Sequence, residues 1–301
     1  SNSCILCFKV LQLIYINWLM KAVIFSLLGW MFLPVMDGFA KFLSTDLPVL
    51  QITWARYFFT VAFTLPIMLF FFRRNLVWTE KPKLQLLRGL ILLTANICFF
   101  YSISIISLAK SLTLAFIAPL IVTAFSPIFL NEKVGLRRWS AVIIGFIGSL
   151  VVIRPGFVEI NLASLAALGT GLMYGFYLII TRKLSTSDNP LLTLLLTGVV
   201  GAIIISTVMP FVWVKPTLNQ WSMMAGIGVF ACLGHLFIIL SLKYADASKL
   251  APFSYFEIIT NIIIGYYFFS DFPDNWTFLG LFIIVLSGIY ISRRENLAKR
   301  F

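Results

Sequence analysis

Ten long apolar runs, separated by short polar breaks, make up most of the chain. A helix needs about 20 mostly apolar residues to cross the hydrocarbon core of a bilayer, whereas a transmembrane β-barrel would show weakly alternating segments of about ten residues. The pattern therefore predicts an all-α polytopic membrane protein. Its ten transmembrane helices are expected at approximately residues 22–42, 49–72, 86–106, 110–130, 138–153, 162–181, 191–213, 221–242, 249–269 and 276–292.

Proline and glycine inside these runs predict bends and close helix contacts. Proline lacks a backbone N–H donor and so disrupts a helix, and glycine lets two helices approach closely. We expect the spans to break or kink at Pro34, Pro66, Pro119, Pro127, Pro210 and Pro252. We expect close helix contacts at Gly145, Gly148, Gly171 and Gly175.

Composition supports the membrane assignment. Hydrophobic residues make up 60% of the 301 positions and charged residues only 11%, whereas soluble domains contain about 25% charged residues. The net charge is +12, but the basic residues form short clusters between the apolar runs. Such clusters orient membrane proteins, so we expect a lipid bilayer, and not nucleic acid, as the partner of this charge.

The basic residues are divided unequally between the two sides of the predicted membrane. Of the 23 Lys and Arg residues, 18 lie on the side of the N-terminus, Arg88 included, three lie in the opposite connections, and Lys41 and Arg56 lie inside spans. Cytoplasmic loops carry the excess of Lys and Arg. We therefore predict a multi-pass protein of the inner (plasma) membrane with both termini in the cytoplasm.

The second half of the chain matches the first at a constant offset. This first offset aligns Lys110 with Lys249, and it also aligns Glu132 with Asp271, Arg154 with Arg293, Gly89 with Gly228, and Asn96 with His235. A second, slightly longer offset aligns Leu43-Ser44-Thr45 with Leu184-Ser185-Thr186. Ordered matches at one offset indicate an internal repeat. We predict an interfacial segment or N-terminal extension at 1–20, a first five-helix repeat at 21–156 and a second at 157–301.

Five helices per repeat is an odd number, so the second repeat must be inverted in the membrane relative to the first. The loop at Glu132 also carries Lys133, Arg137 and Arg138, whereas the loop at Asp271 carries no basic residue. Inverted repeats around a central cavity at the bilayer midplane are common in secondary transporters, because two equivalent halves can exchange conformations. The alternatives are an inverted-repeat channel or a scaffold.

Four charged residues lie inside the predicted spans, namely Asp37, Lys41, Arg56 and Glu257. Such groups are costly in hydrocarbon and usually face a cavity or a partner. Asp37 can pair with Arg56 or with Lys41, which lies one helical turn further along the same helix face. This pair could bind a charged substrate or gate the outer vestibule, or it could be static, with Lys41 extending toward water.

The single histidine, His235, is expected on a span next to that of Glu257. Either residue could carry a proton or hold a cationic substrate, and His235 could instead be a satisfied packing residue. Aromatic faces suit a planar or cationic organic solute, and those near the polar span residues are Trp30, Trp54, Phe100, Tyr101, Tyr174, Tyr177, Phe253 and Tyr255. The predicted cavity residues are Asp37, Arg56, Asn96, Tyr101, Tyr177, His235, Tyr255 and Glu257.

The chain contains no recognisable catalytic or ATP-binding motif. One histidine and one Cys4–Cys7 pair do not make a metal site. We therefore expect no enzyme activity, cofactor or metal. The remaining expectation is a secondary transporter of a small organic solute that works by alternating access, with protons as a candidate coupling ion, and the alternative is a passive channel.

Several motifs resemble the EamA domain of the drug/metabolite transporter superfamily. The first copy is carried by Arg88-Gly89, Pro119, Leu130-Asn131-Glu132, Arg137-Arg138-Trp139, Gly145-Phe146-Ile147-Gly148 and Arg154-Pro155-Gly156, and the second by Lys249-Leu250-Ala251-Pro252-Phe253-Ser254-Tyr255, Asp271, Pro273, Gly280 and Gly288. The resemblance covers nearly all of the chain after residue 20 and implies ten spans in two inverted repeats. One departure is that Pro119 aligns with Ile258, so the nearest proline of the second half is Pro252.

Within the family, the sequence is similar to the branch that includes bacterial S-adenosylmethionine and riboflavin carriers. This resemblance implies a small organic metabolite as the substrate. A cationic nucleoside such as S-adenosylmethionine would favour the acidic span residues. A flavin or an aromatic amino acid would favour the aromatic residues.

We expect cysteines introduced near the two ends of the chain to react with a membrane-impermeant maleimide from the same side of the membrane. Because both termini are predicted in the cytoplasm, labelling should occur in inside-out vesicles and not in right-side-out vesicles. Tails that react from opposite faces would contradict an even number of spans.

Overall fold

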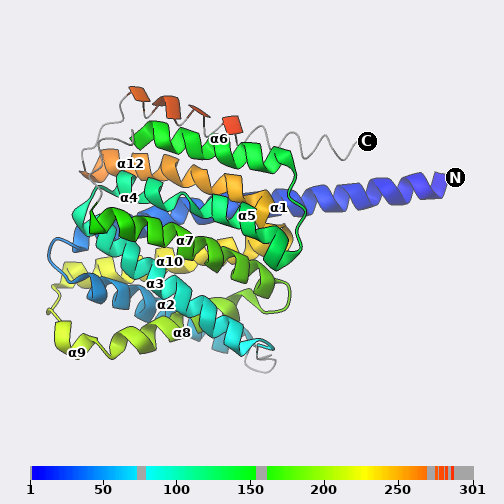
Figure 1. Cartoon of the computed structure of the whole chain (residues 1–301). Helices are drawn as coiled ribbons and strands as arrows, with labels where there is room; N and C mark the ends of the chain where they lie inside the picture. Colours follow the sequence, from blue (N-terminus) through cyan, green and yellow to red (C-terminus); the bar gives the residue numbers. More distant parts are fainter. Residues whose placement is uncertain are drawn as a thin grey trace.

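A computed structural model of the chain describes residues 2–72, 79–153 and 161–269, and four short stretches at 275–276, 278–280, 282–283 and 286–287. Within these residues the regular secondary structure is entirely helical. Figure 1 shows long helices that lie side by side in one bundle, with the N-terminal part of the first helix projecting from it. The all-α fold predicted from the apolar runs is confirmed for this part of the chain.

The helices agree closely with the predicted runs. Those of the first half are α1 (Asn2–Leu43), α2 (Val49–Phe72), α3 (Pro82–Ile105), α4 (Leu108–Ala115), α5 (Ala118–Leu130) and α6 (Leu136–Ile153). Those of the second half are α7 (Leu162–Ser185), α8 (Pro190–Ser206), α9 (Met209–Val212), α10 (Leu218–Tyr244), α11 (Ala247–Leu250), the 3₁₀ helix η1 (Ala251–Phe256) and α12 (Glu257–Phe269). The run expected at 276–292 lies largely outside the described residues.

Length and composition allow five of the described helices to cross a membrane. They are Trp18–Leu43, Val49–Phe70, Pro82–Ile105, Leu162–Ser185 and Leu218–Tyr244. The shorter helices Ala118–Leu130 and Pro190–Ser206 are also apolar. The backbone from Asn2 to Leu43 forms one helix, so the first span continues upstream of the predicted start at residue 22.

Three of the six prolines coincide with breaks in the helices. Pro119 follows the turn between α4 and α5, Pro210 follows the turn between α8 and α9, and Pro252 lies in η1. Pro34, Pro66 and Pro127 lie inside helices that continue past them. The expected breaks are therefore found at Pro119, Pro210 and Pro252, whereas the other three prolines do not interrupt their helices.

The ends of several helices are fixed by side-chain caps in the polar breaks. The Asn161 side chain accepts a hydrogen bond from Ser164 N at the start of α7, and Asn189 accepts one from Leu191 N at the start of α8. Thr217 and Gln220 form a reciprocal capping box at the start of α10. Such caps satisfy the free backbone N–H groups of a first helical turn, so the short polar breaks determine where the helices begin.

Helix bounds recur between the two halves of the chain. The first offset, which aligns Lys110 with Lys249, places both ends of α5 on the ends of α12. It also places the end of α3 on the end of α10, and the start of α4 on the start of α11. The second offset, which aligns Leu43 with Leu184, places the start of α2 on the start of α8. The helix breaks recur as well, because α4 and α5 correspond in position to the segment that contains α11, η1 and α12.

Two close helix contacts recur at the same offsets. A Cβ atom added to Gly89 on α3 would lie 2.9 Å from Val200 Cβ on α8, and one added to Gly228 on α10 would overlap Phe59 Cβ on α2. The first offset aligns Gly89 with Gly228, and the second offset aligns Phe59 with Val200. Helix α3 therefore packs on α8 in the way that α10 packs on α2.

Other glycines also permit close approach, as the sequence pattern predicts. A Cβ atom on Gly145 would overlap the Tyr255 ring, one on Gly171 would meet the Ala115 carbonyl oxygen at 2.5 Å, and one on Gly175 would meet Ile121 at 2.7 Å. Gly148, one turn further along α6, is also buried. The described contacts bring α6, α4 and α5 against helices of the second half, so the central packing joins the two halves.

We expect Gly228→Ala to destabilise the protein by about 1–3 kcal/mol, as overpacking of a tight core does. The added methyl group would lie 3.1 Å from the backbone of Phe59 as well as against its side chain, so a rotamer change cannot relieve the contact. Gly169→Ala is the matched control, because a Cβ atom there has no neighbour within 4 Å and alanine favours the helix. Thermal unfolding in detergent should show a lower Tm only for Gly228→Ala, and equal Tm values would contradict this packing.

Candidate functional site

A cavity lies between helices of both halves of the chain. Its walls come from α1, α3, α4 and α5 in the first half and from α7, α10, η1 and α12 in the second. The empty space, its opening included, is about 630 Å³. This space between the two halves is the central cavity of the described bundle.

The two recurring helix breaks both face this central cavity. Phe116 and Pro119 contribute from the break between α4 and α5, and Ser254 contributes from η1. Irregular backbone at membrane depth is tolerated where it lines a cavity or is buried in protein, and interrupted helices form the substrate sites of many transporters. The breaks thus place backbone polar groups beside the cavity without exposing them to lipid.

Aromatic and aliphatic side chains make up most of the cavity wall. Trp30 and Tyr174 lie on opposite helices, α1 and α7, with ring centroids 6.0 Å apart. The Trp30 indole N–H donates to Ser26 Oγ at 3.2 Å. The Tyr174 hydroxyl is buried and has no hydrogen-bond partner among the described residues. A solute that enters the cavity can therefore supply the missing partner.

Two carboxyl groups line the central cavity, from Asp37 on α1 and Glu257 on α12. Asp37 is 3% exposed and Glu257 is 7% exposed. Among the described residues, neither carboxyl group has a hydrogen-bond or ion-pair partner, and Asp37 Oδ1 is fully buried. Two unpaired acids in a mostly apolar cavity strongly favour the presence of a cation or of protons.

The two basic residues expected near Asp37 contact other groups. Lys41 Nζ donates to the carbonyl oxygens of Ile103 at 2.6 Å and Ile106 at 3.2 Å, at the end of α3. Arg56 is 2% exposed and donates from Nε to Met36 Sδ at 3.4 Å. Of the described contacts of Asp37, none is an ion pair with Arg56. Arg56 therefore lies near Asp37, but its guanidinium forms its described hydrogen bonds with other residues.

His235 joins Arg56 to the wall of the cavity. Arg56 Nη2 lies 2.6 Å from His235 Nε2, and His235 Nδ1 lies 2.9 Å from the Tyr177 hydroxyl. Because a guanidinium can only donate, Nε2 must accept, and the ring proton must be on Nδ1. His235 is therefore a neutral ring whose two nitrogens are both occupied, and this matches its interpretation as a satisfied packing residue.

Arg88 extends this chain of contacts into the core, and its expected place was wrong. It was counted with the connections on the side of the N-terminus, yet it is fully buried within α3. Its guanidinium donates to the Tyr177 hydroxyl at 2.7 Å, to Thr181 Oγ1 at 2.7 Å and to Thr197 Oγ1. Little in the sequence signals this burial, because Arg88 lies close to the polar break that precedes its span.

The other predicted cavity residues divide between wall and core. Asn96 lines the cavity and donates to the Tyr57 hydroxyl at 2.9 Å. Tyr177 and Tyr255 are fully buried behind the cavity wall, where they contact the wall residues His235 and Phe116 respectively. The Tyr255 hydroxyl donates to the Val142 carbonyl oxygen at 3.1 Å. Tyr101 is half-buried, and the described cavity wall does not include it. Four predicted residues therefore face the cavity, namely Asp37, Asn96, His235 and Glu257.

Comparison with known proteins places the chain in a family. The sequence profile of the EamA-like transporter family matches residues 13–154 and again residues 161–293. The chain is 26% identical over 276 residues to the S-adenosylmethionine uptake transporter of Rickettsia bellii, in an alignment that covers 90% of this chain and 94% of that protein.

Two further relatives are named for other substrates. The riboflavin transporter of Vibrio cholerae is 26% identical, over 88% of this chain and 91% of that protein. The pseudopaline exporter of Pseudomonas aeruginosa is 26% identical, over 93% and 99%. The relatives thus agree on transport and disagree on the solute.

A solved structure has the same fold. The alignment has a TM-score of 0.73 at 15% identity and covers 89% of this chain and 94% of the other. The expectation of a transporter, and not an enzyme, is confirmed by the family and by the names of the relatives. The chain is a member of the EamA-like transporter family, within the drug/metabolite transporter superfamily.

Proposed function

We propose that this protein is a secondary transporter that carries a small organic cation through the central cavity by alternating access. The observation that carries the proposal is the pair of unpartnered carboxyl groups, Asp37 and Glu257, on the wall of one apolar cavity between the two halves. A positive charge on the solute would offset the free-energy cost of burying these two carboxyl groups in their ionised form.

The proposed alternating-access mechanism depends on ten spans arranged as two inverted repeats. Support comes from the two successive family matches, from the helix bounds that recur at the two offsets, and from the matched packing of Gly89 and Gly228.

A further recurrence supports the repeat. Thr170 Oγ1 on α7 donates to Ala95 O on α3 at 3.2 Å. The second offset aligns Gly29 with Thr170, and the first offset aligns Ala95 with Gly234. A Cβ atom on Gly29 would lie 3.0 Å from Gly234 O. Helix α1 therefore approaches the carbonyl groups of α10 at the position where α7 approaches those of α3.

The proposed orientation has both termini in the cytoplasm of the inner membrane. It rests on the excess of Lys and Arg on one side of the chain. With five spans per half, equivalent segments of the two halves then lie on opposite sides of the membrane. An exchange of conformation between the halves would open the central cavity first to one side and then to the other.

A cation fits the cavity better than a neutral flavin does. The aromatic pair of Trp30 and Tyr174 can contact a planar base or a cationic group, and the two carboxyl groups add negative charge that a neutral flavin leaves unpaired. S-adenosylmethionine, for which four of the relatives are named, combines an adenine ring with a sulfonium cation. It is therefore the first compound to test, with riboflavin as the neutral comparison.

Glu257 is the proposed proton carrier if transport is coupled to protons. His235 is less suited, because Arg56 and Tyr177 occupy both of its ring nitrogens. Glu257 faces the cavity and has no described hydrogen-bond or ion-pair partner, so it can exchange a proton with water or with the solute. The alternative of a passive channel predicts no counterflow of labelled solute in liposomes, whereas a carrier predicts saturable counterflow.

We expect Glu257→Gln to weaken S-adenosylmethionine binding roughly 30-fold or more, because removal of one partner of a buried charge interaction costs about 2 kcal/mol or more. Glutamine keeps the size of the side chain and removes only its charge. Glu80→Gln, at an exposed glutamate, is the control that should bind normally. Ligand-dependent thermal shift measures binding, and counterflow in liposomes measures transport. Normal counterflow by Glu257→Gln across the pH range would remove this carboxyl group from the mechanism.

We expect Trp30→Leu to weaken binding of the same cation by about 3-fold to 30-fold, the range of a cation–π contact of about 0.5–2 kcal/mol. Trp18→Leu, on the exposed face of the same helix, should leave binding unchanged. Because Trp30 lies beside the cavity and Trp18 does not, equal affinities of the two variants would show that the aromatic wall does not contact the solute.

A further inference from the structure

A second, smaller cavity continues from the central cavity toward one end of the bundle. Trp30, Pro119, Leu178 and Ser254 line both cavities. The smaller cavity has about 330 Å³ of empty space and extends to Leu242, near the end of α10, and Ala247, the start of α11. The two cavities are therefore adjacent, and together they make up the candidate solute route, whose far end lies at the connection between α10 and α11.

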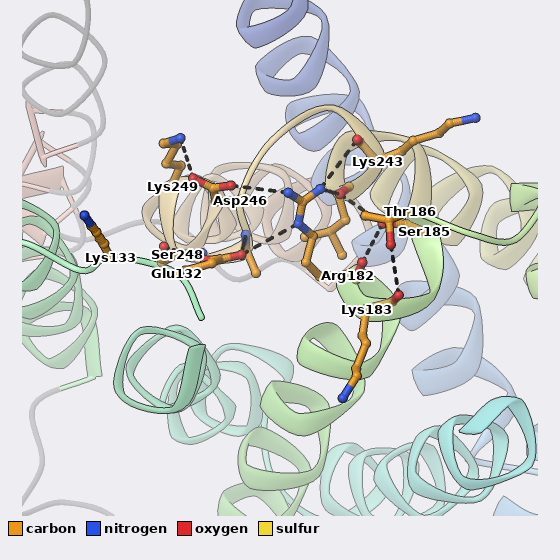
Figure 2. A network of polar contacts seen from close by, with 12 residues as sticks. Glu132, Lys133, Arg182, Lys183, Ser185, Thr186, Lys243, Asp246, Ser248 and Lys249 are labelled. Atoms are coloured by element: carbon orange, nitrogen blue, oxygen red, sulfur yellow. Dashed lines mark hydrogen bonds and ion pairs between the residues drawn. The ribbon is translucent and has the colours of Figure 1, made fainter. Parts of the chain in front are cut away.

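A cluster of charged residues, drawn in Figure 2, contacts the backbone of Leu242 and Ala247 at this far end. Arg182, in the last turn of α7, donates from Nη1 to Leu242 O at 2.5 Å and from Nη2 to Asp246 Oδ1 at 3.2 Å. Lys249 Nζ forms an ion pair with the other oxygen of Asp246. Burial acts to raise the pKa of Asp246, but the hydrogen bond and charge of Lys249 and the charge of Arg182 outweigh it and lower this pKa below its usual value. Asp246 is therefore ionised at neutral pH.

Glu132 brings the first half of the chain to the same cluster. Asn131 ends α5 with a left-handed backbone conformation, φ 54°, and the chain turns so that Glu132 reaches α11. The Glu132 carboxylate accepts from Ala247 N at 2.9 Å, from Ser248 N at 3.0 Å and from Ser248 Oγ at 2.6 Å. It also lies 3.7 Å from Arg182 Nε. Glu132 thus caps the first turn of α11, and it also contacts Arg182, which donates a hydrogen bond to Leu242 O.

We propose that Glu132, Arg182 and Asp246 form an ionic latch that closes the cytoplasmic mouth of the solute route and opens once in each transport cycle. The inference rests on the proposed function, and the positive-inside orientation makes this mouth cytoplasmic. The latch contacts Leu242 and Ala247, the residues at the far end of the smaller cavity. Its partners come from both halves of the chain, so relative movement of the halves separates them.

The local structure suits an element that moves. The latch holds α11, a helix of four residues, which continues directly into a 3₁₀ helix that lines both cavities. The side chains of Arg182 and Asp246 are 19% and 28% exposed, so water can reach their contacts. The Glu132 side chain is 6% exposed, so separation of its contacts depends on movement of α11 away from it.

The first half of the chain carries a corresponding cation, Lys41. The second offset aligns Lys41 with Arg182, and the first offset aligns their partners, Ile103 and Leu242. The serine three positions after each cation donates to its carbonyl oxygen in both halves. In the inverted arrangement these two matched contacts lie on opposite sides of the membrane. Each half therefore supplies one cation that holds the carbonyl end of a neighbouring helix at one mouth.

The test is the accessibility of a cysteine inside the smaller cavity. Ser241, which lines that cavity and is 2% exposed, is replaced by cysteine in a protein whose four native cysteines are serine. Inside-out vesicles are treated with a membrane-impermeant methanethiosulfonate reagent, and the labelling rate is measured. We expect Glu132→Gln and Arg182→Ala each to increase this rate about tenfold, because each loses contacts that stabilise only the closed state.

Two control variants separate opening of the latch from general loosening. Lys183→Ala, beside Arg182, removes an exposed cation whose side chain points away from the cluster (Figure 2), and it should leave the rate unchanged. Lys41→Ala, at the other mouth, should leave the cytoplasmic labelling rate unchanged or lower it. An unchanged rate in both latch variants, or an equal increase in the controls, would overturn the latch. Labelling requires no solute, so absence of counterflow by the unmodified protein would overturn the proposed function without affecting this result.

Discussion

A charged side chain in a bilayer must find polar partners within the protein, and this constraint accounts for the arrangement of the buried residues here. Arg88 is satisfied by hydroxyl groups of Tyr177, Thr181 and Thr197, and Arg56 is satisfied by a neutral His235. In the described contacts these cations do not use carboxylates as partners. The two acids on the cavity wall, Asp37 and Glu257, have no such partner among the described residues, and in the proposed function the cationic solute supplies it.

The same constraint explains why the broken helices meet at the cavity. Carbonyl and N–H groups that leave a regular helix need partners or water, and the breaks near Pro119 and Pro252 lie where both halves of the chain surround an open space. At the ends of α3 and α10, Lys41 and Arg182 supply donors to such carbonyl groups. In the proposed latch, the side chain of Arg182 thus serves both to satisfy the backbone and to close the solute route.

Much of this fold follows from the sequence because hydrocarbon imposes long apolar runs, and the helix bounds match those runs closely. The acids on the cavity wall were also predictable, since Asp37 and Glu257 are isolated within such runs. The partners were not. Arg88 lies near a polar break and reads as a loop residue, and nothing local shows that Arg56 reaches His235, 179 positions away. Contacts between distant spans depend on helix rotation, which apolar runs of this kind do not fix.

Similar backbones with different side chains explain how a nearly symmetric bundle makes an asymmetric site. Asn96 and His235 occupy matching positions, yet Asn96 donates to a tyrosine hydroxyl while His235 accepts from an arginine. Glu257 begins α12 at the position where Ala118 begins α5. A carrier needs halves alike enough to exchange conformations, but it can recognise its solute with groups from unlike positions. Divergence at the cavity wall is therefore compatible with recurrence of the helix ends, where both halves must bend and close in the same way.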